Sequence, residues 1–333
     1  MRILVATGIY PPAVGGPSYY AKGLVEALAL LGHEAKPVTF GPLLRYPTGI
    51  RHLLFFLQLL KYMFWADRVI ALDTVSVAVP VAVATSIFRT PFVVRTGGDF
   101  VWEQYLERTG ELFPLKDFYT KTRTFSRKEK LLLRATSYVV RRASLIIFST
   151  QMQKDIWVAA YHIDTTKARI IGNAVETELP SVEPTKKNFL WYVRNTAFKN
   201  SARLHEAFNE AKQRYPEIIL EEGQVPQKEL FLSMQSCYAV ILPSLTDISP
   251  NYIVDALRFR KPFIMDMYSG MAEQFKPYGT LVDPESVEDI VRAIENLASE
   301  EGYRKALEKV RTFSQVRTYK EIAKEFVTLL ETV

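Results

Sequence analysis

The sequence predicts an α/β protein built from two doubly wound, parallel-sheet domains. Short continuous apolar segments alternate with longer segments of helical period along both halves of the chain, which is typical of parallel strands covered by helices on both faces. A length of 333 residues suits two domains. A polar, proline-containing stretch over residues 180–188 interrupts the alternation and is expected to be the linker.

The elements follow in order from the hydrophobic pattern. In the first half, strands are expected at 2–7, 34–40, 68–72, 92–95 and 145–149, with a helix at 18–31 that Gly32 ends. In the second half, strands are expected at 189–193, 217–221, 239–242 and 262–266, and helices at 201–214, 227–235, 250–259, 287–299, 302–313 and 319–330. We expect domains at 1–178 and 186–314, with the last helix (315–333) able to pack back onto the first domain.

Composition excludes several classes of protein. A hydrophobic fraction of 48% with 23% charged residues is ordinary for a globular chain and unlike a disordered one. The single cysteine, Cys237, excludes a disulfide framework and suits a reducing compartment. The apolar segments 53–65 and 69–88 are too short, or too interrupted by Asp73 and Pro80, to be spanning helices. No signal peptide is recognised, so a cytoplasmic protein is expected.

Charge is unevenly distributed. Residues 1–150 hold 19 basic and 10 acidic residues, whereas residues 151–333 carry a net charge of −3. A basic half suits an anionic partner. Basic and apolar residues alternate from Arg123 to Arg142, which suits peripheral contact with an anionic membrane; the alternative is an ordinary amphipathic helix packed on the sheet. No recognised module supports nucleic-acid binding.

Four loops that follow expected strands hold the candidate chemistry, because ligands of doubly wound sheets bind beyond the carboxyl ends of the strands. Loop 10–18 contains Gly15 and Gly16 before a helix start, which outlines an anion or sugar site or a plain turn. Loop 95–99 ends in Gly97, Gly98 and Asp99, and either approaches a ligand closely or caps a helix.

The other two loops carry charge. Arg194 and Lys199 follow the strand 189–193 and can neutralise a diphosphate, unless they are simply solvated. Loop 243–255 places Asp247 before a helix and Asp255 within it, and both carboxylates can accept hydrogen bonds from sugar hydroxyls. Ser249 is the expected N-cap of this helix and Pro250 its first residue.

Taken together, these pieces resemble family 4 retaining glycosyltransferases of the GT-B fold. The resemblance spans nearly the whole chain. Its matching segments are the opening 9–16 with 31–34, the crossover 170–176, the Arg194/Lys199 pair, the segment 243–256 and the closing 279–284. It implies transfer of a sugar from a nucleotide-diphosphate sugar to a glycan or lipid-linked acceptor, with retention, in polysaccharide or glycolipid assembly at the cytoplasmic face of the membrane.

The resemblance also implies roles for individual residues. The catalytic set would be Asp99, Asp247, Arg194 and Lys199. The donor-binding set would be Gly15, Gly16, Arg194, Lys199, Asp247, Ser249, Asn251 and Asp255. The acceptor side would be Gly97, Gly98 and Asp99. No cofactor is implied beyond the nucleotide sugar as co-substrate. No metal is expected, because no D-x-D sequence occurs in the chain.

The chain departs from the family pattern in four places. Val193 and Asn200 stand where the family has glycines beside the Arg and Lys, and the two acids are Asp rather than Glu. Ser249-Pro250 replaces the glycines between the acids, and the segment 215–225 is short, as though a Gly-rich unit had been trimmed. An alternative function is therefore a GT-B-like protein that binds nucleotide or glycan and has lost catalysis.

Overall fold

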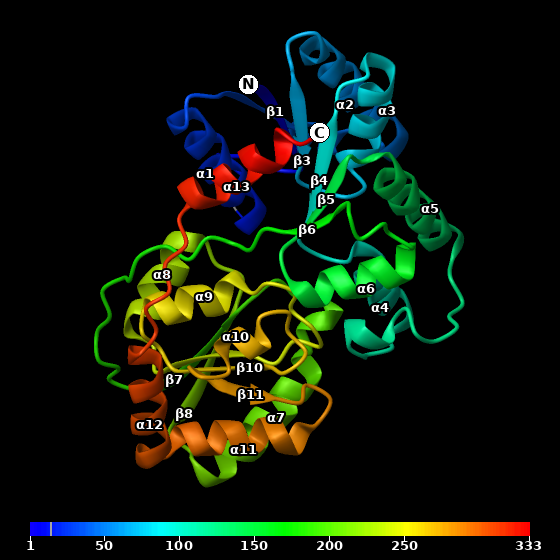
Figure 1. Ribbon diagram of the computed structural model, residues 1–333. Coiled ribbons are helices and arrows are strands. Elements are labelled where there is room, and N and C mark those ends of the chain that lie inside the picture. The colour runs from blue at the N-terminus through cyan, green and yellow to red at the C-terminus, as the bar shows by residue number, and fades with distance from the viewer. Residues whose placement is uncertain (14) are drawn as a thin grey trace. The chain divides into compact units, whose positions relative to one another are not determined.

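The computed structural model describes residues 1–13 and 15–333, which form two compact units (Figure 1). The first unit contains Met1–Val101, Thr124–Ala174 and Arg317–Val333, and the second contains Trp102–Arg123 and Val175–Val316. Each unit has its own parallel sheet and its own hydrophobic core.

The first unit is built on a six-stranded parallel sheet with the order β2-β1-β3-β4-β5-β6. The strands are β1 (Arg2–Thr7), β2 (Glu34–Thr39), β3 (Arg68–Ala71), β4 (Phe92–Thr96), β5 (Leu145–Phe148) and β6 (Ala168–Ile170). The helices are α1 (Gly16–Leu30), α2 (Thr48–Met63), α3 (Ala78–Phe88), α5 (Arg127–Arg142), α6 (Gln151–Tyr161) and α13 (Tyr319–Leu330), with the 3-10 helix η1 (Gly41–Arg45).

Both faces of this sheet are buried. Along β1, Ile3 and Val5 pack into the cluster formed with α1 and α13, whereas Leu4 and Ala6 pack into the cluster formed with α2, α3 and α5. Figure 1 shows α1 and α13 together, and α2, α3 and α5 as a separate group. This double coverage explains why the strands read as continuous apolar runs rather than as alternating ones.

The second unit is built on a five-stranded parallel sheet with the order β11-β10-β9-β7-β8. The strands are β7 (Lys187–Tyr192), β8 (Ile218–Gly223), β9 (Ala239–Leu242), β10 (Phe263–Asp266) and β11 (Thr280–Val282). The helices are α7 (Ser201–Arg214), α8 (Gln227–Ser236), α9 (Asn251–Arg258), α10 (Ala272–Phe275), α11 (Val287–Ala298) and α12 (Glu300–Arg311), with 3-10 helices η2 (Leu115–Asp117) and η3 (Ala197–Lys199).

The fold class predicted from the sequence is confirmed, and its strands lie within two residues of their expected positions. The three-residue strands β6 and β11 were not predicted. The last helix, α13, packs against α1 in the first unit. The segment Trp102–Arg123, which comprises most of α4 (Phe100–Thr109), η2 and their connections, belongs to the second unit.

Candidate functional site

The carboxyl ends of the adjacent strands β7 and β9 bring Lys199 and Asp247 together. Lys199 Nζ lies 2.5 Å from Asp247 Oδ2, and only 11% and 18% of the two side chains are exposed. Lys199 ends the short η3 turn after β7, and Asp247 lies on the loop after β9. The loss of either partner would leave the other as a poorly solvated charge, so this pair fixes the two loops together.

Asn200 stands where the glycosyltransferase pattern has a glycine, and its backbone conformation is one that favours glycine. Its φ of 62° lies in the left-handed region, which favours glycine and which asparagine adopts more readily than most residues. Its side-chain amide donates to Pro243 O at 3.0 Å and to Pro284 O at 2.7 Å. The residue that replaces glycine therefore keeps the required backbone conformation and also ties together the loops that follow β7, β9 and β11.

A second acid lies at this edge of the sheet. Asp266, the last residue of β10, is fully buried, and among the described residues its carboxyl oxygens have no hydrogen-bond partner of normal geometry. Burial, followed by the charge of Asp247, raises the pKa of Asp266 well above its usual value. The sequence pattern does not single out Asp266, because an acid at the end of an apolar strand resembles a turn residue.

Two further polar groups at this edge are buried and have no hydrogen-bond partner among the described residues. They are Thr196 Oγ1, in the loop between Arg194 and Lys199, and Ser244 Oγ, in the loop after β9. Buried polar groups are normally hydrogen-bonded, and each one left unpaired is costly. Such groups, clustered at the carboxyl ends of three neighbouring strands, are suited to receiving a polar ligand.

Asp255 lies on α9 in a largely buried position. Its side chain is 16% exposed and accepts a hydrogen bond from Arg258 Nη1 at 3.0 Å, and Arg258 also lies 3.2 Å from Glu176. Burial raises the pKa of Asp255 from 3.8 to about 6, even though Arg258 acts in the opposite direction. A carboxylate that is poorly solvated and only partly compensated is a strong acceptor for hydroxyl donors.

The start of α9 differs from the prediction. The helix begins at Asn251, Pro250 occupies the N-cap position, and no side chain caps the helix. Ser249 is therefore not the N-cap; its hydroxyl lies 3.4 Å from Met271 Sδ. The N-terminal N–H groups of α9 consequently have no capping side chain.

Arg194, the other predicted cation, lies on the loop between β7 and η3. It is exposed, and the described part of the chain provides no ion-pair or hydrogen-bond partner for it. Its guanidinium is therefore available to an external group, in contrast to Lys199.

The segment Trp102–Arg123 supports the loops of this site, and the sequence analysis missed it. Glu107 Oε1 accepts from Ala197 N at 2.7 Å, and Leu115 N donates to Thr246 Oγ1 at 3.0 Å. Lys116 Nζ lies 3.5 Å from the centre of the Tyr268 ring. The segment thus contacts the loops that follow β7, β9 and β10, next to Lys199, Asp247 and Asp266.

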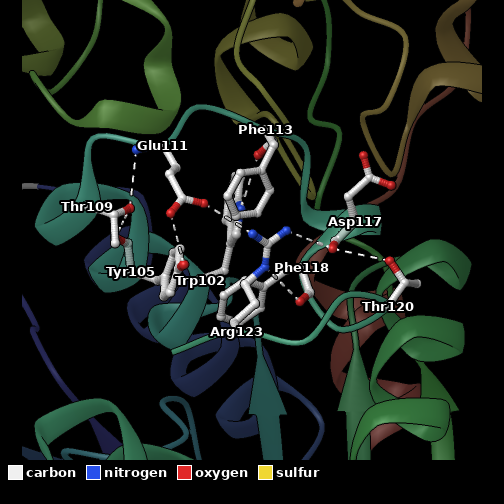
Figure 2. Close-up of polar contacts among 9 residues, drawn as sticks. All are labelled: Trp102, Tyr105, Thr109, Glu111, Phe113, Asp117, Phe118, Thr120 and Arg123. Carbon is white, nitrogen blue, oxygen red and sulfur yellow. Dashed lines mark hydrogen bonds and ion pairs between the residues drawn. The ribbon is translucent and has the colours of Figure 1, made fainter. Parts of the chain in front are cut away.

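Arg123 holds this segment in shape (Figure 2). Its guanidinium lies over the Phe113 ring, with Cζ 3.7 Å from the ring centre. It donates to Phe118 O and Asp117 O and pairs with Glu111 at 3.2 Å. Arg123 is therefore not part of an exposed basic surface, as its place in the basic stretch had suggested.

The remaining basic residues of that stretch are exposed on α5. They are Arg127, Lys128, Lys130, Arg134, Arg141 and Arg142. The opposite side of the helix is packed through Val139 and Val140, and a capping box of Ser126 and Glu129 begins it. The helix is amphipathic, with one basic face and one face in the core.

The two predicted glycine loops lie in the first unit. Gly15 precedes α1 with a φ of 149°, a conformation that favours glycine, and its carbonyl accepts from Ser18 N. Val14, in the same loop, lies outside the described residues. Asp99 is buried, and its Oδ2 accepts from Trp157 Nε1 at 2.9 Å. Gln153 Nε2 donates to Gly98 O at 3.2 Å, so the Gly97–Asp99 turn is held from α6.

The described residues hold neither a cluster suited to a metal ion nor a helix suited to crossing a membrane. No set of three or more His, Cys, Asp and Glu side chains within them is placed to hold a metal ion. None of their helices is both long enough and apolar enough to span a bilayer.

Part of the second unit is similar to a known protein family. Residues 222–311 match the family model of glycosyl transferases group 1, a region that includes Asp247, Asp255 and Asp266. No curated protein sequence matches the chain.

Solved structures extend the similarity to the whole chain. A sucrose-phosphate synthase from Thermosynechococcus elongatus is similar with a TM-score of 0.73 and 13% identity, over 99% of this chain and 98% of that one. The Anabaena protein HepE in complex with UDP-glucose has a TM-score of 0.71 and 15% identity over 100% of both chains. WaaG, a glycosyltransferase involved in lipopolysaccharide biosynthesis, has a TM-score of 0.66 and 11% identity over 98% of this chain and 99% of that one. The two units have the architecture of the GT-B glycosyltransferases, and part of the second matches the family model of glycosyl transferases group 1.

Proposed function

We propose that this protein is a glycosyltransferase that moves a sugar from a nucleotide-diphosphate sugar to a glycan or lipid-linked acceptor, with retention and without a metal. One observation carries the proposal: Lys199, Asp247 and a set of unpaired polar groups lie together at the carboxyl edge of β7, β9 and β10. The match of residues 222–311 to glycosyl transferases group 1 supports it, as does the likeness to a structure with bound UDP-glucose.

The donor diphosphate would bind at the loop after β7. Negative charge builds on the departing diphosphate as the glycosidic carbon becomes oxocarbenium-like. Arg194 is unpaired and can chelate phosphate oxygens, and Lys199 adds a second cation. The N-terminus of α7, which begins at Ser201, adds a positive helix dipole at the same loop. Fixed cations and the N-terminus of a helix would thus stabilise the departing diphosphate, as a bridging metal ion does in enzymes that use one.

The acids have separate proposed roles. Asp247 already holds Lys199, and we propose that it orients this ammonium for the phosphate and contacts the donor sugar. Asp255 would accept hydrogen bonds from the ribose hydroxyls. Ser249 and Asn251, at the start of α9, would line the same pocket.

From the resemblance we also propose that Gly15 and Gly16 contact the donor phosphates or the acceptor, and that the Gly97–Gly98–Asp99 turn contacts the acceptor. Because its carboxylate is buried against Trp157, we propose that Asp99 acts by holding this turn.

Contact with a membrane is proposed for the first unit. Leu53 and Leu57 of α2 are exposed, as is Phe64 just beyond that helix, and α5 carries six exposed basic residues. α3 contacts both α2 and α5. A surface that combines apolar and basic side chains suits an anionic bilayer. Co-sedimentation with anionic vesicles that falls with added salt would support this, whereas no binding at low salt would reject it.

The test of the activity is release of nucleoside diphosphate from a panel of nucleotide sugars. We expect release from at least one donor by the wild type, and loss of that release in Lys199→Ala. The matched control is Lys305→Ala, which removes an exposed lysine that pairs with Glu301 on α12. If no donor is turned over but uridine or guanosine diphosphate binds and Arg194→Ala abolishes the binding, the chain is a nucleotide-binding protein without catalysis.

A further inference from the structure

The end of β4 in the first unit holds a guanidinium that has no acid to neutralise it. Arg95 is only 8% exposed, and the part of the chain that the structure describes offers it no ion pair. Its Nη2 donates to Asn173 Oδ1, and its Cζ lies 3.9 Å from the centre of the Tyr20 ring. Arginine is rarely buried unless it is paired with an anion, so this position lacks a counter-charge.

Neighbouring groups lack acceptors as well. Among the described residues, the Nε atoms of Arg95 and Arg317 and the hydroxyl of Tyr20 are buried with no hydrogen bond of normal geometry. Burial raises the pKa of Tyr20, and the nearby charges of Arg95 and Arg317 act in the opposite direction. The two Nε atoms can only donate a hydrogen bond, and the tyrosine hydroxyl is also able to donate one. The cluster is therefore short of an acceptor.

The charges around Tyr20 do not balance. Arg317 pairs with Glu325 at 2.7 and 2.8 Å through its Nη2, which leaves the charge of Arg95 uncompensated. The charged groups that act on Tyr20 are Arg95 on β4, Arg317 in the segment before α13, and Glu325 on α13. Two cations and one carboxylate leave one positive charge, and a single anion would balance it.

Glycines leave space beside both arginines. A methyl group on Gly97 would lie 3.5 Å from Arg95 Nη1, and one on Gly172 would lie 3.9 Å from Arg317 Nε. Both distances are ordinary contacts, so side chains at these positions would fill the space that the glycines leave open. Arg317 is partly exposed, which gives this space a route to solvent.

We propose that Arg95, Arg317 and Tyr20 form a binding site for one oxyanion group, a phosphate monoester or a carboxylate. The anion would accept from the unpaired Nε and hydroxyl groups and would neutralise Arg95. Assigning that group to the sugar acceptor rests on the proposed function, but the binding site itself does not.

The test is calorimetric titration of the full chain with inorganic phosphate and, separately, with acetate. The titration uses an Arg194→Ala background, which removes the cation that has no partner among the described residues at the proposed donor loop. We expect saturable binding of one anion per chain. Arg95→Gln should weaken it by about ten-fold or more, because a charge-assisted bond is lost. Tyr20→Phe should weaken it about five-fold, the effect of one hydrogen bond.

Tyr20→Phe also separates binding from folding. In the free protein its buried hydroxyl forms no hydrogen bond of normal geometry with the described residues, so the variant should melt no lower than the parent without phosphate and should gain less stability when phosphate is added. The matched control is Arg214→Gln, which removes an exposed arginine paired with Glu295 and should leave anion binding unchanged.

Two results would overturn the site: no saturable binding of either anion, as expected if only water fills the space, or equal binding by the parent, Arg95→Gln and Tyr20→Phe. Vesicles that contain phosphatidic acid identify the source of the group. Vesicle binding that Tyr20→Phe weakens supports a lipid headgroup as the ligand, and binding of the free ions alone supports a soluble phosphate or carboxylate. Because the readout is binding, the result is independent of whether Lys199→Ala abolishes sugar transfer.

Discussion

Asp255→Asn should change how the stability of the second unit depends on pH. Burial raises the pKa of Asp255 from 3.8 to about 6 in the folded chain. Below pH 3.8 the carboxyl is protonated in both the folded and the unfolded state, and burial carries no electrostatic penalty. As the pH rises through 6, the folded protein must ionise a poorly solvated group, so the stability present at low pH is lost.

The magnitude follows from the size of the shift. A difference of about two pKa units, at about 1.36 kcal/mol per unit, corresponds to a penalty of about 3 kcal/mol when the group is fully ionised. Asparagine has nearly the same shape and no charge. Arg258 keeps a second acid, Glu176, at 3.2 Å in the variant. The free energy of unfolding of the variant, relative to wild type, should therefore rise by about 1.4 kcal/mol between pH 5 and pH 8.

Hydrogen exchange of peptides from the second unit, measured through a urea titration at each pH, gives the required free energies. Asp164→Asn, read from peptides of the first unit that contains it, is the control, because hydrogen bonds from Thr166 lower the pKa of this exposed carboxyl. Its pH effect should have the opposite sign and should be complete below pH 5. Parallel pH profiles for Asp255→Asn and wild type would refute the reasoning, since they would mean that Asp255 is not desolvated.

Three further predictions follow from the same contacts. Affinity for nucleoside diphosphate should rise between pH 5 and pH 7.5 in wild type but not in Asp255→Asn, because the ionised carboxyl is the better acceptor for ribose hydroxyls. Calorimetry at each pH measures this affinity, and equal pH profiles for the two proteins would contradict the prediction. Lys199→Ala should destabilise the second unit by up to about 3–5 kcal/mol, because Asp247 is left as a poorly solvated charge. Adding Asp247→Ala should recover part of the lost stability in urea unfolding, and no recovery would argue against the ion pair. Arg123→Gln should destabilise the segment 102–123 by about 2 kcal/mol and speed hydrogen exchange of its amides, while exchange in peptides of β1 stays unchanged. Unchanged exchange in the segment 102–123 would show that Arg123 does not hold it.

The architecture was predictable because its signals are local. Strands such as β1 and β9 are continuous apolar runs, which only a sheet covered on both faces produces. The same logic placed Lys199 and Asp247 at the carboxyl edge of the second sheet, where they form an ion pair. The three-residue strands β6 and β11 were missed, because a run of that length carries too little pattern to separate it from a loop.

The missed parts depend on contacts between residues distant in sequence. The segment 102–123 reads as a continuation of the first half, and only tertiary contacts such as Glu107 with Ala197 and Leu115 with Thr246 join it to the second unit. The sequence likewise gives no sign that Arg95 would be buried without an acid, since its burial depends on Tyr20 and Asn173. Asn200 shows the opposite case, because a departure from the glycine pattern preserves the backbone conformation.

The central claim is that the edge of β7, β9 and β10 binds a nucleotide sugar and activates its diphosphate. The most direct measurement is release of nucleoside diphosphate from a panel of nucleotide sugars by wild type, Lys199→Ala and Lys305→Ala. The account predicts release from at least one donor by wild type and Lys305→Ala, and its loss in Lys199→Ala. Absence of release from every donor by the wild-type protein, or equal release by all three proteins, would contradict it.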